Sequence, residues 1–258
     1  MIVLLALIGF VVGTLVGLTG VGGGSIMTPI LVALGVNPLV AVGTDLVLSV
    51  PTRIYGARLH FKQGTVKLEF VKYLLFGGIP AATAGLLLLM WLRRVVDMHI
   101  VQQWVSHAIG ASICLAAILL VYSRFTRPAE GALPESPLPS HYRARLIVLG
   151  VVVGLIVSVT SIGSGSVTLP LLAILLPGTA LSQLIGSDLA FSACLIPVAA
   201  IGHWTMGDVN FPLALNLLVG SIPGVYFGSK FCRALQQRWL RPAVALVLIV
   251  VGMRLIVV

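Results

Sequence analysis

Long apolar runs separated by short polar breaks occupy almost the whole chain. The runs fall at about residues 1–19, 25–36, 39–57, 70–92, 103–123, 146–160, 166–176, 181–201, 210–229 and 241–258. Most of them approach the roughly 20 apolar residues that a helix needs to cross the hydrocarbon core of a bilayer. The runs are continuous rather than alternating, so they predict helices and not the strands of a β-barrel. We therefore expect an all-α polytopic membrane protein embedded in the lipid bilayer.

The composition agrees with this pattern and argues against a soluble enzyme. Of the 258 residues, 59% are hydrophobic and 9% are charged, and the mean hydropathy is +1.12. A soluble domain carries about 25% charged residues. Residues 1–44 and 146–187 contain no charged side chain.

Net charge and cysteine content add no further class of partner. The net charge is +9, but no basic block is interleaved with stacking aromatics, so we expect no nucleic-acid partner. The three cysteines, Cys114, Cys194 and Cys232, form no C-x-x-C pair. Neither a disulfide framework nor a zinc site is indicated, and we expect no metal and no cofactor.

A segment rich in proline and charge divides the chain in two. Residues 124–145 read RFTRPAEGALPESPLPSHYRAR, a composition that is typical of a solvated linker. The sequence therefore predicts an N-terminal membrane repeat over 1–123 and a C-terminal membrane repeat over 146–258.

The two halves repeat each other. LTGVGGGSIMTP (18–29) matches VTSIGSGSVTLP (159–170), and VGTDL matches IGSDL, which places Asp45 opposite Asp188. Further matched pairs follow at the same spacing as the two aspartates: His60 and His203, Gly64 and Gly207, and Pro80 and Pro223. A spacing held over this length is hard to obtain by chance, so we infer an internal duplication.

The distribution of basic residues predicts how the halves are oriented. If residues 1–36 enter the membrane and return to the same side, thirteen Lys and Arg residues share one face and three lie on the other. A single crossing by residues 1–36 would divide them almost evenly. Because basic loops stay in the cytoplasm, the returning path is favoured. It predicts inverted halves in a cell (inner) membrane, a cytoplasmic linker and non-cytoplasmic termini, which is a common construction of secondary transporters.

Each half contains a break rich in glycine or serine. The first break is Gly-Val-Gly-Gly-Gly-Ser (20–25), and the second is Ser-Ile-Gly-Ser-Gly-Ser (161–166). The apolar runs that follow would span only about half of a bilayer. Each half would then be a short or re-entrant helix pair followed by about three transmembrane helices.

The N-termini of such half-depth helices offer free N–H groups and the positive end of a dipole, which suit an anion. The alternative is that the small residues only permit tight helix packing. The expected anion ligands are Gly22, Gly23, Gly24, Ser25, Gly163, Ser164, Gly165 and Ser166.

Asp45 and Asp188 are carboxylates at membrane depth, where ionisable groups are costly and are candidates for function. They could carry protons or another coupling ion, or they could accept hydrogen bonds that hold each hairpin open. Thr44 and Ser187, one residue earlier, offer neutral donors to an anion in the same region. Arg53 could attract anions at a cytoplasmic entrance, or it could extend its side chain to lipid headgroups.

The histidines are weaker candidates. His60 and His203 lie at loop positions and are expected to cap helices or to lie at the interface rather than to carry protons. An alternative function is an intramembrane enzyme or redox protein that uses Asp45, Asp188 and His107. The sequence shows no nucleophile–base motif and no metal-ligand spacing for such an activity.

The motifs resemble those of the TauE/SafE family of membrane proteins over essentially the whole chain. A downstream G-T-D-L and a degenerate second copy, in which Ser158, Ser161 and Ser164 replace three glycines, accompany the family motif. That motif, G-x-x-G-x-G-G-G-S with a following proline, falls on Gly17, Gly20, Gly22, Gly23, Gly24, Ser25 and Pro29.

The resemblance implies an exporter of sulfite or organosulfonates, or more broadly a transporter of small anions, and not an enzyme. We expect the anion to be bound at the midplane by main-chain N–H groups of Gly23 to Ser25 and of Ser164 to Ser166. The sequence leaves open which anion is moved and whether the chain forms a homodimer.

Overall fold

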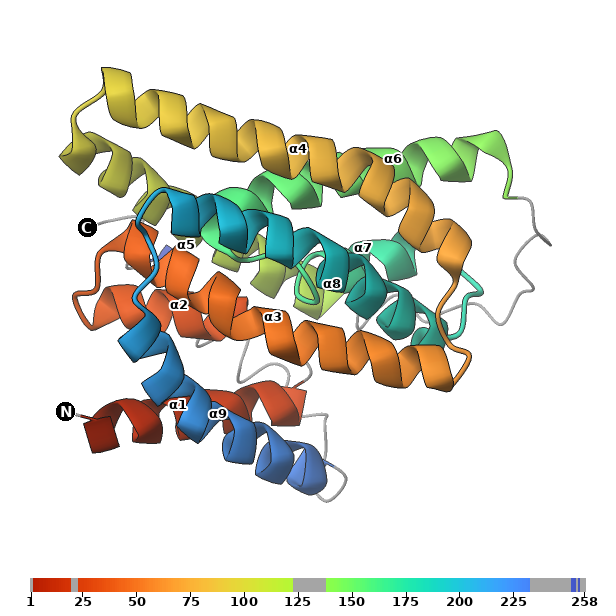
Figure 1. The fold of residues 1–258 in the computed structure, drawn as a ribbon. Helices are drawn as coiled ribbons and strands as arrows, with labels where there is room; N and C mark the ends of the chain where they lie inside the picture. Colours follow the sequence, from red (N-terminus) through yellow and green to blue (C-terminus); the bar gives the residue numbers. More distant parts are fainter. Residues whose placement is uncertain (1, 20–22, 123–137, 233–251, 254, 256–258) are drawn as a thin grey trace.

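The computed structural model describes residues 2–19, 23–122, 138–232, 252, 253 and 255, and within these residues every regular element is a helix (Figure 1). The helices are α1 (Ile2–Thr19), α2 (Gly24–Ala33), α3 (Pro38–Lys62), α4 (Leu68–Val95), α5 (Met98–Tyr122), α6 (Ser140–Thr160), α7 (Thr168–Leu175), α8 (Leu181–Thr205) and α9 (Phe211–Cys232). Five stretches are long and apolar enough to cross a membrane: α4, α5, α6, α8 and Phe211–Gly228 of α9. The prediction of an all-α polytopic membrane protein is confirmed.

Two helices are too short to cross a bilayer. α2 has 10 residues and α7 has 8, so at 1.5 Å per residue they extend about 15 and 12 Å. Each follows one of the two breaks. In Figure 1 the N-terminus and the α2–α3 connection lie at the same end of the molecule, so this part of the chain runs inward and returns.

The predicted linker and the first helix of the second half overlap. α6 begins at Ser140, after Pro139, within the range 124–145 that the sequence marks as linker. Residues 123–137 lie outside the described part of the chain. The polar first two turns of α6 carry Arg143 and Arg145, which a hydropathy pattern alone assigns to a loop.

Three helix pairs organise the core: α1 packs along α9, α4 along α6, and α3 along α8. In the repeat alignment α1 corresponds to α6 and α4 to α9, so the first two pairs are equivalent. α3 and α8 run antiparallel, because Thr44 near the start of α3 contacts Asn210 beyond the end of α8. At the other end Ser187 of α8 contacts Lys67 beyond the end of α3. Two inverted halves would produce this arrangement.

Glycines bring the helices of each equivalent pair into backbone contact. A Cβ atom added to Gly9 would lie 2.3 Å from the carbonyl oxygen of Leu217, and one added to Gly150 would lie 2.2 Å from that of Leu74. Gly9 and Gly150 are matched in the repeat, and so are Leu217 and Leu74. Both pairs are therefore held by the same close contact, and we treat the α1/α9 pair and the α4/α6 pair as rigid units.

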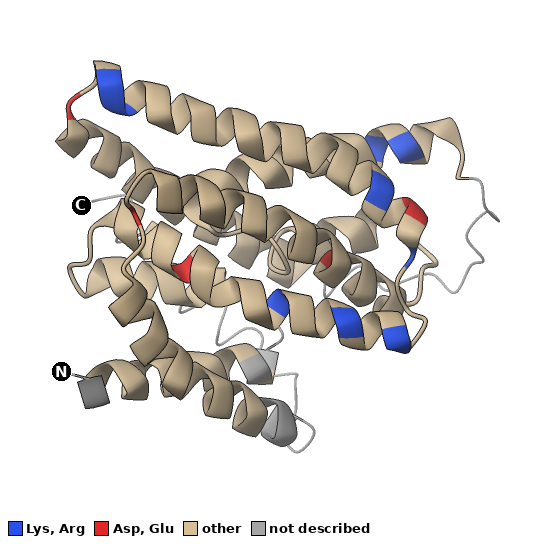
Figure 2. Ribbon diagram, viewed as in Figure 1, with Lys and Arg blue, Asp and Glu red and all other residues tan. Residues whose placement is uncertain are grey.

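Most charged residues in the described part of the chain lie toward the two ends of the helix bundle, and a few lie between them (Figure 2). We call the end formed by the C-terminus of α3 and the N-termini of α4 and α6 the basic end, because Lys and Arg residues concentrate there. The opposite end, where α4 ends and α8 connects to α9, is called the Asp208 end; it carries Arg93 and Arg94 with Asp208. The cytoplasmic position that the basic loops predict for this end stays a prediction.

Candidate functional site

Asp45 of α3 ties the two halves together at the breaks. Its Oδ2 atom accepts hydrogen bonds from the Thr28 hydroxyl of α2 at 3.0 Å and from the Ser161 hydroxyl of the second break at 2.6 Å. Asp45 is fully buried. A carboxylate that receives two hydroxyl donors in the interior fixes the positions of both donors. Asp45 therefore joins the first half-depth helix to the break of the opposite half.

The same contact needs glycine in the first break. A Cβ atom added to Gly24 would lie 2.2 Å from the carbonyl oxygen of Ser161 and 3.0 Å from Oδ2 of Asp45. Ser161 itself has φ 61° and is the only non-glycine residue with positive φ in the described part of the chain. The two breaks therefore touch through their backbones at Gly24 and Ser161.

Asp188 of α8 is held by the second break of its own half and by the charge of Arg53 from the other half. Its Oδ1 atom accepts a hydrogen bond from the backbone N–H of Gly165 at 3.4 Å. The residue is 3% exposed. The two matched carboxylates thus both contact the second break, one from each half of the chain.

Arg53 lies beside the second break, not at the surface. It is 9% exposed on α3, and its Nη2 atom donates a hydrogen bond to the carbonyl oxygen of Ser164 at 3.0 Å. Asp188 and Asp45 both act electrostatically on its guanidinium group. A cation in this position has two carboxylates nearby and a backbone acceptor in direct contact.

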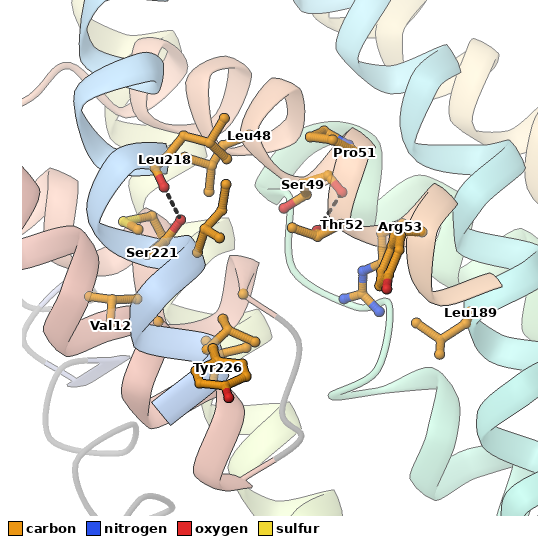
Figure 3. Close-up of a pocket in the computed structure, with 17 residues that line it drawn as sticks. Val12, Leu48, Ser49, Pro51, Thr52, Arg53, Leu189, Leu218, Ser221 and Tyr226 are labelled. Atoms are coloured by element: carbon orange, nitrogen blue, oxygen red, sulfur yellow. Dashed lines mark hydrogen bonds between the residues drawn. The ribbon is translucent and has the colours of Figure 1, made fainter. Parts of the chain in front are cut away.

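A cavity of about 570 Å³ opens beside Arg53, between the α1/α9 pair and α3 (Figure 3). Figure 3 shows Ser49, Thr52 and Arg53 of α3 facing Leu218, Ser221 and Tyr226 of α9 across this space. Gly23 of the first break also lines the cavity. Most of the remaining wall is aliphatic: Val12, Val16, Met27, Leu48, Leu189, Ile222 and Val225.

Three buried polar atoms near the breaks have no hydrogen-bond partner among the described residues: Oγ of Ser25, Oγ of Ser166 and Oδ1 of Asp45. Ser25 and Ser166 are 1% and 2% exposed and occupy matched positions in the two breaks. Buried hydroxyls are normally satisfied, so a matched unsatisfied pair calls for an explanation. A ligand with oxygen acceptors would supply one.

Thr44 and Ser187 make a different contact from the one expected. The Thr44 hydroxyl oxygen accepts the backbone N–H of Asn210 at 3.1 Å, just before α9. The Ser187 hydroxyl oxygen accepts the backbone N–H of Lys67 at 3.0 Å, just before α4. Each residue therefore bonds the backbone just before a helix of the opposite half, at opposite ends of the bundle, and both lie in positions that stabilise the fold.

The matched histidines form matched turns. The ring Nδ1 of His60 lies 2.8 Å from Oγ1 of Thr65, and that of His203 lies 3.1 Å from Oδ2 of Asp208, five residues later in each case. Gly64 (φ 68°) and Gly207 (φ 79°) supply the positive φ that each turn requires. The expectation of loop positions is wrong: both histidines lie in the last turns of α3 and α8, where each contacts the turn that follows its helix, and His203 is fully buried.

Comparison with known proteins identifies one family over nearly the full length of the chain. The family model described as Sulfite exporter TauE/SafE matches residues 5–255. The chain belongs to this family. The expectation drawn from the glycine motif is thereby confirmed, and the protein is a multi-pass membrane protein of the TauE/SafE transporter family.

Curated relatives cover nearly all of the chain. The probable membrane transporter protein YjnA of Bacillus subtilis is 40% identical over 260 residues, which are 99% of this chain and 100% of that protein. The probable membrane transporter protein YdhB of the same organism is 25% identical over 254 residues, 98% of this chain and 99% of that protein. A probable membrane transporter protein of Haemophilus influenzae is 26% identical over 279 residues, 98% of this chain and 97% of that protein. No solved structure matches the chain significantly.

Within this TauE/SafE chain the structure places most of the predicted residues together. Gly23, Gly24 and Ser25 lie next to the second break with Asp45, Asp188 and Arg53, whereas Gly22 lies outside the described residues. His107 is exposed on α5, away from the buried carboxylates. Among the described residues no group of three or more His, Cys, Asp or Glu side chains is placed to hold a metal ion.

Sequence reasoning missed the two donors to Asp45. Thr28 lies four residues after Gly24, and the sequence does not distinguish it from the other Ser and Thr residues of the apolar runs. Ser161 was visible as a departure from glycine in the second copy, but its partner is 116 positions away in the chain. Only the folded arrangement of the two halves brings these groups together.

Proposed function

We propose that this TauE/SafE protein is a secondary transporter that exports a small sulfur-containing anion, sulfite or an organosulfonate. The observation that carries the proposal is the position of Arg53. This buried cation contacts the second break through Ser164 and lines a cavity that Gly23 of the first break also lines. An anion in the cavity would therefore meet a positive charge and the first break, and Arg53 would connect it to the second break.

The breaks would supply hydrogen-bond donors to the anion. The first N–H groups of a helix have no partner within that helix, and the dipole there favours negative charge. We assign anion binding to the main-chain N–H groups of Gly23 to Ser25 and to those of Ser164 and Ser166, because the Gly165 N–H group already donates to Asp188. The unpartnered hydroxyls of Ser25 and Ser166 support this assignment, because sulfite and sulfonate oxygens accept such bonds.

Asp45 and Asp188 hold the breaks in place in this scheme. Asp45 already receives the Thr28 and Ser161 hydroxyls, and Asp188 receives the Gly165 N–H group. Their negative charges also keep the guanidinium of Arg53 in position when the cavity is empty. We accordingly assign Arg53 to the binding site itself, deeper than the cytoplasmic entrance that its sequence position suggests.

Export is electrically favourable for an anion. With the basic end in the cytoplasm, the cavity beside α3 would load from the inside of the cell. Moving one negative charge outward gains about 2.3 kcal/mol per 100 mV of an inside-negative membrane potential. Transport of this kind does not require a coupling ion.

Flux into or out of proteoliposomes tests the proposal. The purified protein should move sulfite or methanesulfonate faster than protein-free vesicles and faster than it moves chloride. Arg53→Gln should reduce this flux at least tenfold, because it removes the buried positive charge that faces the anion. Arg58→Gln is the matched control, since Arg58 is exposed on the same helix. Native flux through folded Arg53→Gln would contradict the proposed site.

A further inference from the structure

The two halves match in sequence, but α8 is covered more closely by its neighbouring helix pair than α3 is. Phe191, Leu195, Ala199 and His203 form one stripe of α8, and each is 0% exposed. Of their matched residues on α3, Leu48 is 8% exposed, Thr52 is exposed, and Gly56 and His60 are half-buried. The stripe of α8 is thus fully buried, whereas the matched residues, which form the stripe of α3, are partly exposed.

The helix pairs explain the difference. On α8 the α4/α6 pair covers the stripe: a Cβ atom added to Gly78 of α4 would lie 2.8 Å from the Phe191 ring, and one added to Gly202 would lie 2.4 Å from Leu86. The equivalent α1/α9 pair does not cover the stripe of α3 in this way, because the cavity of about 570 Å³ lies between that pair and α3. Ser221, the residue matched to Gly78, lines that cavity.

A polar network holds the closed side at the Asp208 end. Arg93 at the C-terminus of α4 forms an ion pair with Asp208, whose carboxylate also contacts the His203 ring at 3.1 Å. The other ring nitrogen of His203 lies 2.8 Å from the carbonyl oxygen of Ser158 in α6. The network therefore joins both helices of the α4/α6 pair to the end of α8. Its matched turn at the basic end has Thr65 in place of Asp208.

We propose that Arg93, Asp208 and His203 form a gate that closes the Asp208 end of the transport path. This inference rests on the proposed transport function. To release the anion, the α4/α6 pair swings away from α8 and separates Arg93 from Asp208 and His203 from Ser158. The α1/α9 pair closes on α3 in the same transition.

The duplication supplies the physical reason for this exchange. Because the two halves have similar sequences and pack through the same glycine contacts, a state in which they exchange conformations has similar contacts and a comparable energy. In that state the stripe on α8 lines a cavity that is open at the Asp208 end, and the stripe on α3 is covered.

Cross-linking tests the gate through flux. In a variant with Cys114, Cys194 and Cys232 replaced by alanine, Arg93→Cys with Asp208→Cys should transport until a short, cleavable bis-thiol reagent joins the two positions. Flux should then fall at least tenfold and return after cleavage. The control pair is Glu69→Cys with Leu138→Cys, two contacting residues at the basic ends of α4 and α6, which belong to one rigid unit. Cross-linking the control pair should leave flux unchanged, and undiminished flux through the cross-linked 93–208 pair would overturn the gate.

Thiol labelling tests the same motion without any substrate. A membrane-impermeant maleimide should label Thr52→Cys from the basic end and Leu195→Cys from the Asp208 end. Adding Asp208→Asn should raise labelling of Leu195→Cys several-fold and lower that of Thr52→Cys. Leu195→Cys that stays unlabelled in the Asp208→Asn variant would overturn the gate. Reciprocal labelling without flux of sulfite or methanesulfonate would support the gate and contradict only the proposed substrate.

Discussion

The two breaks occupy matched positions in the two halves, but their residues make different contacts. The first break is glycine-rich and supplies space, because Gly24 lies against the Ser161 carbonyl with no room for a side chain. The second break is serine-rich and supplies side chains, because Ser161 donates to Asp45. Two halves with matched elements therefore need not make the same contacts, and the second break supplies hydroxyl groups that the first break lacks.

The carboxylates show the same division. Asp45 receives two hydroxyl donors, one from each half, whereas Asp188 receives a backbone N–H group of its own half and interacts with Arg53 of the other half through charge. Asp45 thus links the halves through hydroxyl groups, and Asp188 links them through a buried cation. If this difference is correct, equal substitutions at matched positions will have unequal effects.

The largest effect is expected where the two breaks touch. Gly24→Leu places a side chain against the Ser161 backbone, which cannot give way without moving the second break. We expect flux to fall more than tenfold and stability to fall by about 1–3 kcal/mol or more, as for overpacked interiors. Flux in proteoliposomes and thermal unfolding in detergent measure the two effects.

Gly23→Ala is the matched control for stability at the first break. A Cβ atom at Gly23 would meet only the Ser49 hydroxyl, at 3.9 Å. This variant should therefore keep the thermal unfolding temperature of the native protein. If Gly24→Leu unfolds at the native temperature and transports normally, the contact between the breaks is not part of the working structure.

A smaller difference is expected between the two carboxylates. Asp45→Asn keeps the shape of the side chain but replaces one oxygen by an NH₂ group, so it weakens acceptance from Thr28 and Ser161. Leaving buried hydroxyls without acceptors costs about 1–3 kcal/mol. Asp188→Asn should cost more, because it removes the negative charge that faces the buried Arg53, although the Gly165 N–H group can still bond to the amide oxygen. Chemical unfolding of both variants measures the difference, and equal losses would remove the distinction between the carboxylates.

Much of the fold could be predicted from the sequence because its signals are local. Helix positions follow from apolar runs, and the duplication follows from aligned motifs. The helix ends were predicted less accurately. The apolar run that ends near residue 57 continues as α3 to Lys62, and the run that starts at residue 146 belongs to α6, which begins at Ser140. Hydropathy reports the part of a helix that lies in lipid, whereas backbone hydrogen bonding continues through polar turns at the interface.

Contacts between the halves could not be predicted in the same way. The sequence placed Arg53 at an entrance, but its bond to Ser164 depends on how α3 meets the second break. The difference in closure between the two halves is equally invisible, because matched sequences predict matched packing. Such features arise when two similar halves adopt different conformations in one chain.

The smallest predicted effect concerns Thr44 and Ser187, which make matching contacts at opposite ends of the bundle. Each hydroxyl accepts a backbone N–H group just before a helix of the opposite half, at 3.1 and 3.0 Å. Thr44→Val and Ser187→Ala should therefore lower stability by similar amounts, about 1 kcal/mol each, as for the loss of a helix cap. The half-saturation concentration for the transported anion should change little, because these oxygens are occupied by the backbone. A large and selective rise in that concentration would instead return both residues to the anion site, and it would mean that the cap gives way when the anion binds.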